Sequence, residues 1–229
     1  AHYNIAVGRS ALSANTTGSE NIASGYYALH TTTTGNYNTA YGTSALYNST
    51  TASGNTAIGR NAMYANTTGD TNVAVGYDAL KANTTGGQNT SVGYGSLNAA
   101  TTASSNTAVG YLTLNATTTG QYNCAFGRQA LEANTTADSN NAFGYQAGKA
   151  NTTGRWNSAI GFDAFQANTS GNDNTALGEY SGYTNITGNK NVYFGGHSGQ
   201  LSTGSGSVFI GYGAGYYDRL IESLKKKKK

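Results

Sequence analysis

The sequence predicts an all-β protein, a parallel β-solenoid in which about 13 coils, each one 17-residue repeat, stack into a rod. The motif Asn-x-Ala-x-Gly recurs with one constant step from Asn4 to Asn191, and a thirteenth copy begins one position early, at Ser207. Small residues alternate with larger ones inside the motif, which indicates a strand. The 32 glycines, the lack of proline and the 10% of charged residues differ from the composition of an ordinary globular domain.

The repeat divides the chain into two parts of unequal length. We expect the solenoid to span residues 1–217 and a short helical or disordered basic tail to span residues 218–229. Asp218 is of a helix-capping type, and Leu220, Ile221 and Leu224 would share one helix face. One or two turns of helix are too short to be stable alone. The tail is therefore not expected to form a domain.

The fifth position of the repeat, counted from its asparagine, is glycine in all thirteen copies. An invariant glycine inside a repeat indicates either a positive φ or a neighbour that leaves no space for a Cβ atom. Stacking of the coils would place these glycines in one column. The central members of this column are Gly59, Gly76, Gly93, Gly110 and Gly127.

Positions 1 to 5 of each copy predict the strand of the coil. Positions 1, 3 and 5 carry small residues, whereas positions 2 and 4 carry larger, often β-branched ones. Positions 7 to 9, such as residues 78–80, are expected to form a second short strand. The phrase Ala-Asn-Thr-Thr-Gly at residues 82–86 consists largely of turn-forming types. We therefore expect each coil to contain two short strands and two turns.

Stacked coils place identical side chains above one another at the strand spacing of about 4.8 Å. The asparagines at position 1 are therefore expected to form an amide ladder, and the threonines at positions 13 and 14 to add hydroxyl ladders. The central members of the asparagine ladder are Asn55, Asn72, Asn89, Asn106 and Asn123.

Large apolar side chains are scarce in the repeat. Only positions 4 and 9 carry them regularly, so a lone coil has little interior to offset the conformational entropy of its chain. Burial of one face against other copies of the chain is the simplest remedy. We therefore expect a homo-oligomer, with a trimer as the preferred state.

The phrases Asn72-Val-Ala-Val-Gly76 and Asn106-Thr-Ala-Val-Gly110 resemble the head repeats of trimeric autotransporter adhesins. The longer phrase Asn-Thr-Ala-Val-Gly-Tyr-x-Ala-Leu-x-x-Asn-Thr-Thr-Gly resembles repeats of phage tail-fibre-type proteins. The resemblance covers residues 4–216 and implies a left-handed β-roll of three chains around one axis, outside the cell, on the cell surface or on a virion. The unit is longer than that of adhesin heads, because an Asn-Thr-Thr-Gly insert enlarges one turn.

An aromatic and arginine stripe at position 6 is a candidate binding site. Such side chains dominate binding hot spots, so the stripe would suit a cell-surface receptor or glycan. The alternative is that it packs between subunits. The stripe consists of Tyr26, Arg60, Tyr77, Tyr94, Tyr111, Arg128, Tyr145 and Phe162.

The chain shows no pattern expected of an enzyme, a metal site or a cofactor site. His2, His30 and His197 lack metal-ligand spacing, and no recurrent pair of acidic residues is present. The net charge of +3 depends on the five lysines of residues 225–229; without them 8 basic and 10 acidic residues remain, so nucleic-acid binding is not indicated. No apolar run is long enough for membrane insertion.

Two further readings depend on the turn residues. Flat threonine arrays suggest ice binding, but adjacent strand residues face opposite ways, so positions 13 and 14 would give two single-file rows. The asparagines at position 12 begin Asn-x-Ser/Thr sequons, which we interpret as a by-product of turn chemistry. These asparagines are Asn15, Asn66, Asn83, Asn134, Asn151, Asn168 and Asn185.

Together these features favour a non-enzymatic structural and adhesive fibre segment. It would present a repetitive surface to a cell-surface receptor or glycan, in an extracellular, cell-surface or virion-surface location. A self-assembling extracellular filament subunit, whose coils stack end to end, is the first alternative. An ice-binding protein is the second.

Overall fold

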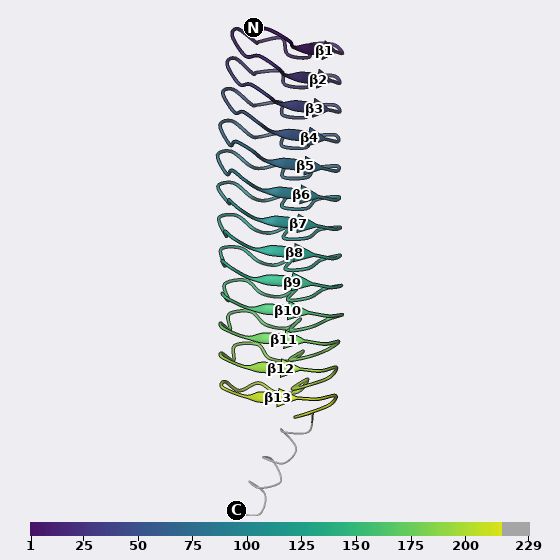
Figure 1. The fold of residues 1–229 in the computed structure, drawn as a ribbon, viewed down its shortest axis with the longest axis vertical. Helices are drawn as coiled ribbons and strands as arrows, with labels where there is room; N and C mark the ends of the chain where they lie inside the picture. The colour runs from purple at the N-terminus through teal and green to yellow at the C-terminus, as the bar shows by residue number, and fades with distance from the viewer. Residues whose placement is uncertain (217–229) are drawn as a thin grey trace, which may run out of the picture.

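In the computed structural model, which describes residues 1–216, the chain winds into a rod with its coils stacked in sequence order (Figure 1). Thirteen strands form a single sheet. The tail expected at residues 218–229 lies outside the described residues. The strands are β1 (Ile5–Val7), β2 (Ile22–Ser24), β3 (Thr39–Tyr41), β4 (Thr56–Ile58), β5 (Val73–Val75), β6 (Thr90–Val92), β7 (Thr107–Val109), β8 (Cys124–Phe126), β9 (Asn141–Phe143), β10 (Ser158–Ile160), β11 (Thr175–Leu177), β12 (Val192–Phe194) and β13 (Val208–Ile210).

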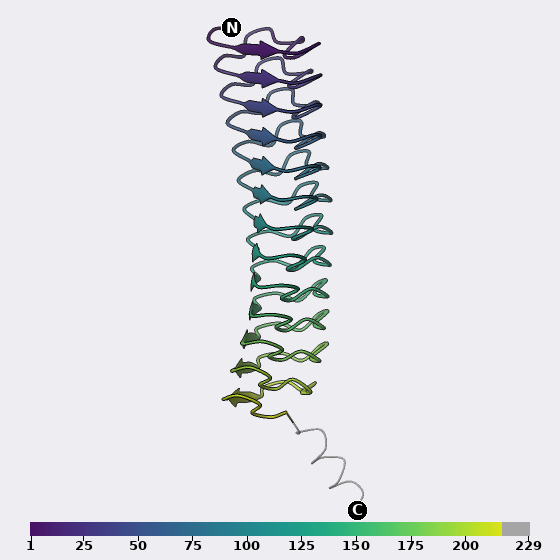
Figure 2. The ribbon, with the colours of Figure 1, turned by 90° about the vertical axis from the view of Figure 1, so that its right-hand side faces the viewer.

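Neighbouring strands are parallel, and their register shifts by one repeat. Ala74 of β5 pairs with Ser91 of β6, which holds the same position in the next copy. The step from Tyr193 of β12 to Phe209 of β13 is one position shorter and absorbs the deletion in the last repeat. The predicted all-β parallel β-solenoid, with one coil per 17-residue repeat, is confirmed. Figure 2 shows that the strands turn gradually around the rod from β1 to β13.

Each described coil contains one strand rather than the expected two. Residues 78–80 form a turn in which Asp78 and Leu80 adopt positive φ angles of 54° and 51°. This conformation points their N–H groups toward neighbouring coils: Asp78 donates to the Arg60 carbonyl at 3.1 Å and Leu80 to the Ser96 carbonyl at 3.0 Å. The turn thus satisfies its backbone groups along the rod, although left-handed φ angles are costly for non-glycine residues.

The small face of the strand lies inside the rod. Ala74 at position 3, Ala79 at position 8 and Leu80 at position 9 are completely buried, and the same positions supply most of the apolar core along the rod. Position 4 points the other way, so that Ile58 is 39% exposed. Of the two positions that regularly carry large apolar residues, only position 9 fills the core.

The glycine at position 5 is required for both of the reasons that the sequence suggested. The central glycines of the column, from Gly59 to Gly127, have φ angles between 127° and 138°. A Cβ atom at Gly76 would also lie 2.5 Å from the carbonyl oxygen of Gly93 in the next coil. No L-residue fits this position without moving the backbone of its neighbour.

Buried asparagines at position 1 close each coil and link it to its neighbours. Asn89 Nδ2 donates to the Ala103 carbonyl of its own coil at 2.8 Å and to Asn72 Oδ1 at 3.1 Å. Asn89 Oδ1 accepts from the backbone N–H of Asn106 at 3.0 Å. The backbone-to-Oδ1 bond continues through Asn123 and recurs along the column in both directions. An amide column therefore runs through the interior beside the apolar core.

Candidate binding surfaces

The predicted stripe at position 6 forms a column of stacked rings on the outside of the rod. The ring centroids of Tyr77 and Tyr94 lie 5.4 Å apart, as do those of Tyr94 and Tyr111. Tyr145 and Phe162 stack at 5.0 Å. The rings of all three pairs are nearly parallel, so each ring covers a face of the next.

Arginines complete this column. The Arg128 guanidinium carbon lies 5.5 Å from the Tyr111 ring and 5.8 Å from the Tyr145 ring, and Arg60 lies 5.8 Å from Tyr77. The structure therefore joins seven of the eight predicted residues, from Arg60 to Phe162, through stacking and cation–π contacts. Tyr26 stands apart, in contact with Arg9 and Tyr27. Its side-chain hydrogen bond with Tyr27 raises the pKa of Tyr26.

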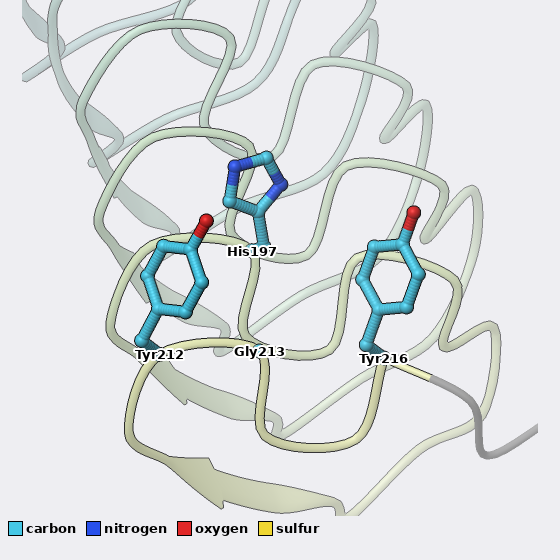
Figure 3. Close-up of a pocket in the computed structure, with 4 residues that line it drawn as sticks. All are labelled: His197, Tyr212, Gly213 and Tyr216. Carbon is cyan, nitrogen blue, oxygen red and sulfur yellow. The ribbon is translucent and has the colours of Figure 1, made fainter.

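Beyond Phe162 the column continues through residues that the position-6 pattern does not contain. Phe162 contacts Tyr180 at 5.5 Å, and Tyr180 stacks on His197 at 5.3 Å. His197, Tyr212, Gly213 and Tyr216 then line a hollow of about 330 Å³ near the last coil (Figure 3). The sequence pattern missed Tyr180 and His197 because they stand at position 7, one residue beyond the stripe.

The outer face of the sheet, formed by positions 2 and 4 and here called the sheet face, is rich in exposed apolar side chains. Phe126 and Phe143 stack on it at 5.1 Å. Ile58, Ile160 and Phe194 are also exposed at position 4. The sheet face, the stripe and Tyr212, which also stands at position 6, carry all of the exposed large apolar side chains among the described residues except Tyr3, Tyr37, Tyr122, Trp156 and Ile186.

Cys124 lies on the sheet face at position 2 of β8 and is half-buried. Burial raises the pKa of its thiol. A reactive cysteine needs a lowered pKa, because the thiolate is the nucleophile. Its surroundings suit a small strand residue.

Four of the five exceptions occupy position 17, the last residue of a coil. Tyr3, Tyr37, Tyr122 and Trp156 are exposed there with positive φ angles between 55° and 59°. The repeat pattern does not single them out, because glycine, polar and charged residues hold the same position in other coils. The signal that would have found them is their spacing: two repeats separate Tyr3 from Tyr37, and two repeats separate Tyr122 from Trp156.

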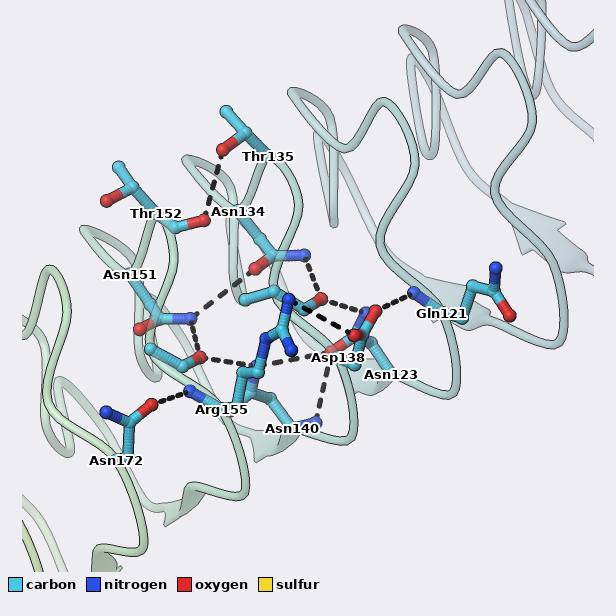
Figure 4. A network of polar contacts seen from close by, with 12 residues as sticks. Gln121, Asn123, Asn134, Thr135, Asp138, Asn140, Asn151, Thr152, Arg155 and Asn172 are labelled. Carbon is cyan, nitrogen blue, oxygen red and sulfur yellow. Dashed lines mark hydrogen bonds and ion pairs between the residues drawn. The ribbon is translucent and has the colours of Figure 1, made fainter.

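Polar side chains at position 16, the residue that precedes these rings in the sequence, bond from coil to coil (Figure 4). Asp138 Oδ1 accepts from the backbone N–H of Gln121 at 2.8 Å, and Asp138 Oδ2 lies 3.6 Å from Arg155. The backbone N–H of Arg155 in turn donates to Asn172 Oδ1 at 2.8 Å. These bonds hold the position-16 side chains in place on the surface of the rod.

The sequon asparagines face inward. Asn66, Asn83 and Asn134 are completely buried, and Nδ2 of Asn66 donates to the Gly69 carbonyl at 3.0 Å. A folded coil therefore does not present these Nδ2 atoms for glycosylation. The neighbouring threonines at position 13 use their hydroxyls within the rod, as when Thr67 Oγ1 donates to the Thr84 carbonyl at 3.0 Å.

Within residues 1–216, no three His, Cys, Asp or Glu side chains come together in a way that could hold a metal ion. The same part of the chain contains no helix with the length and apolar character needed to cross a membrane. Its ion pairs, such as Lys81–Asp78 at 3.0 Å and Lys149–Glu132 at 3.5 Å, lie on the surface.

We compared the chain with protein-family models, with curated proteins and with solved structures, and none of the three comparisons found a match.

Proposed function

We propose that this chain is a non-enzymatic segment of an adhesive fibre, in which copies of the rod associate through the sheet face. The observation that carries the proposal is the apolar column at position 4 of the strands, which is unbroken from Tyr41 of β3 to Ile210 of β13. Large exposed apolar patches on soluble proteins mark interaction sites. A strip that repeats with every coil is best matched by a partner with the same repeat, and a second copy of the chain provides one.

Three copies are the state that we propose. The large strand residues point outward, so the core of a single rod depends on alanine, leucine and asparagine, and association would add the burial that the lone coil lacks. The resemblance to trimeric adhesin heads favours three copies over two. We assign the stripe to the edge of this contact, because only the glycine at position 5 separates it from position 4.

The remaining surface would be presented to a cell-surface receptor or glycan, in an extracellular, cell-surface or virion-surface location. A stiff rod of roughly 60 Å, from twelve strand spacings, suits such presentation. Adhesion needs no reacting group, and the proposal assigns none. We prefer adhesion to ice binding because the position-13 hydroxyls donate their hydrogens to backbone carbonyls of the next coil.

The test is to apply the full chain to a microarray of cell-surface polysaccharides and to image the same sample by negative-stain electron microscopy. We expect short rods and saturable binding to at least one class of glycan. Long filaments without binding to any glycan would contradict adhesion and favour the end-to-end filament. Shaping of ice crystals and thermal hysteresis would favour ice binding.

A further inference from the structure

We propose that Tyr122 and Trp156 form a binding site for an extended β-linked glycan that runs along the rod. This inference rests on the adhesive function proposed above and assigns it to one place. Both residues stand at position 17, and their φ angles are 58° and 55°. Their Cα–Cβ bonds therefore leave the backbone in the same orientation, two coils apart, which is about 10 Å along the rod.

Both rings project into solvent, at 63% exposure for Tyr122 and 58% for Trp156. Ser139, at position 17 of the coil between them, is small and leaves the space between the rings open. This spacing suits two pyranose rings of a straight glycan chain. Tyr3 and Tyr37 repeat the arrangement near the first coil.

Aromatic residues at this position are not explained by stability. A left-handed φ is unfavourable for a bulky residue, and the same position is glycine in two coils, at Gly54 and Gly206. An exposed ring adds little burial to offset that cost. Bulky residues held in an unfavourable backbone conformation at the surface point to a role in recognition.

Ring accessibility separates this pair from the stripe. In the stripe, stacked neighbours at 5.0 to 5.4 Å cover the ring faces of residues such as Tyr94 and leave mainly their edges exposed. Tyr122 and Trp156 have no aromatic neighbour among the described residues. Sugars bind by packing the C–H groups of a pyranose face onto an aromatic face, so open faces are needed. Tyr122 and Trp156 offer such faces two coils apart in one column.

Polar groups beside the rings would bind the sugar hydroxyls. Arg155 precedes Trp156 in the chain, and its side chain remains 47% exposed while it pairs with Asp138. Gln121 precedes Tyr122 and lies at the other end of the same polar row (Figure 4). Stacking platforms flanked by a few fixed donors and acceptors are a usual form of ligand site.

Trp156 is the only tryptophan in the chain, so fluorescence excited where the 18 tyrosines hardly absorb reports on this site alone. The full chain is titrated with cellohexaose, xylohexaose and N-acetylchitohexaose, and with maltohexaose, whose α-linked chain coils. We expect at least one β-linked hexasaccharide to shift the emission saturably and to protect Trp156 from acrylamide, with half-saturation at or below about 1 mM. Maltohexaose should leave the emission unchanged.

Variants test the two rings separately. Tyr122→Ala should weaken binding by about tenfold or more, as loss of a binding hot spot does, with Trp156 still the reporter. Trp156→Ala should abolish retardation in affinity gels and Trp156→Tyr should restore much of it. Ile186→Ala, which removes another exposed apolar side chain, should bind as the original chain does. Circular dichroism establishes that each variant is folded.

An emission spectrum that none of the β-linked hexasaccharides changes would overturn the site, as would equal affinity for Tyr122→Ala and the original chain. Suppose that the double variant Tyr122→Ala with Trp156→Ala binds the polysaccharide microarray as strongly as the original chain does. The adhesive function would then stand and this site would be wrong. If the original chain binds no glycan at all, both the adhesive function and this site would be contradicted.

Discussion

Gly182 leaves the space that the ring of Tyr193 fills: a Cβ atom at Gly182 would lie 2.5 Å from Cδ2 of Tyr193. Gly199, in the next coil, contacts the same ring from the other side. Tyr193 stands at position 3, which is alanine in ten coils, and both glycines stand at position 9, which is leucine or methionine in the first eight. In this part of the rod the large core side chain comes from the strand, at position 3, and the turn residue at position 9 is small. Close packing of the interior requires this compensation.

The first prediction follows from this exchange. Tyr193→Ala should lower the free energy of unfolding by about 3–5 kcal/mol, because it empties the core and removes the hydroxyl that accepts from Asn185 Nδ2 at 2.8 Å. Adding Gly182→Leu and Gly199→Leu should recover much of the loss, since these changes rebuild the usual coil. Denaturant unfolding followed by circular dichroism measures all of these variants.

The same leucines should be strongly destabilising while Tyr193 is present, because they would compete for one space. If the two leucine substitutions lower the free energy of unfolding by the same amount with and without Tyr193, the proposed exchange of volume would be refuted. The double-mutant comparison separates this coupling from the cost of each change alone.

Much of the fold could be predicted because the repeat specifies its own register. The invariant glycine and the asparagine column needed only the 17-residue step and the strand spacing to be placed. Residues 78–80 could not be placed, because Asp78 and Leu80 adopt left-handed angles that their residue types disfavour. Those angles turn the N–H groups of Asp78 and Leu80 toward carbonyls of the neighbouring coils, and the position of these carbonyls is a property of the stack.

The candidate sites were predicted less completely. The stripe was visible as a column of similar residues, whereas Tyr122 and Trp156 recur only every second coil among unrelated residue types. Which strand face lies inside was also not decided by alternation alone. Asparagine and glycine on the small face fix it, because Asn89 must reach both the Ala103 carbonyl and Asn72.

The second prediction concerns the amide column. Asn89→Ala should cost at least about 2 kcal/mol, because it leaves the Ala103 carbonyl and the Asn106 N–H buried without these partners. The matched control is Asn141→Ala, at an exposed position of β9, which should change stability by less than about 0.5 kcal/mol. Equal effects in chemical denaturation would show that the column contributes little.

The third prediction compares one substitution at two backbone conformations. Thr71 has a φ of 56° at position 17, whereas Thr56 belongs to strand β4. Thr71→Gly should raise the free energy of unfolding by about 1 kcal/mol by removing the left-handed strain. Thr56→Gly should lower it by about 1 kcal/mol. Thermal melts of the two variants should shift in opposite directions; parallel shifts would show that position 17 stores no strain.

The fourth prediction is a pH dependence at Asp163. Burial raises the pKa of this carboxyl, and Lys149 partly lowers it. Because the folded-state pKa lies above the unfolded value, the folded chain binds more protons between the two, and stability falls as pH rises through that interval. This contribution to stability is therefore present below the unfolded pKa and lost at neutral pH.

Asp163→Asn should accordingly be more stable than the original chain at neutral pH, and the difference should shrink toward the ordinary aspartate pKa of about 3.9. Asparagine already stands at position 7 in Asn61 and accepts a left-handed φ. Denaturant midpoints of the variant and of the original chain, measured from neutral pH down to the ordinary aspartate pKa, test this expectation. A variant that is less stable at neutral pH would mean that the carboxylate contributes favourably.

The central claim is that the sheet face joins copies of the chain. Sedimentation equilibrium of the full chain, whose mass is 23.6 kDa, tests it most directly. We predict a single species of three chains, and its conversion to single chains by Phe126→Lys with Phe143→Lys, which place charges on the sheet face. A mass of 23.6 kDa for the unaltered chain at every concentration would contradict the account.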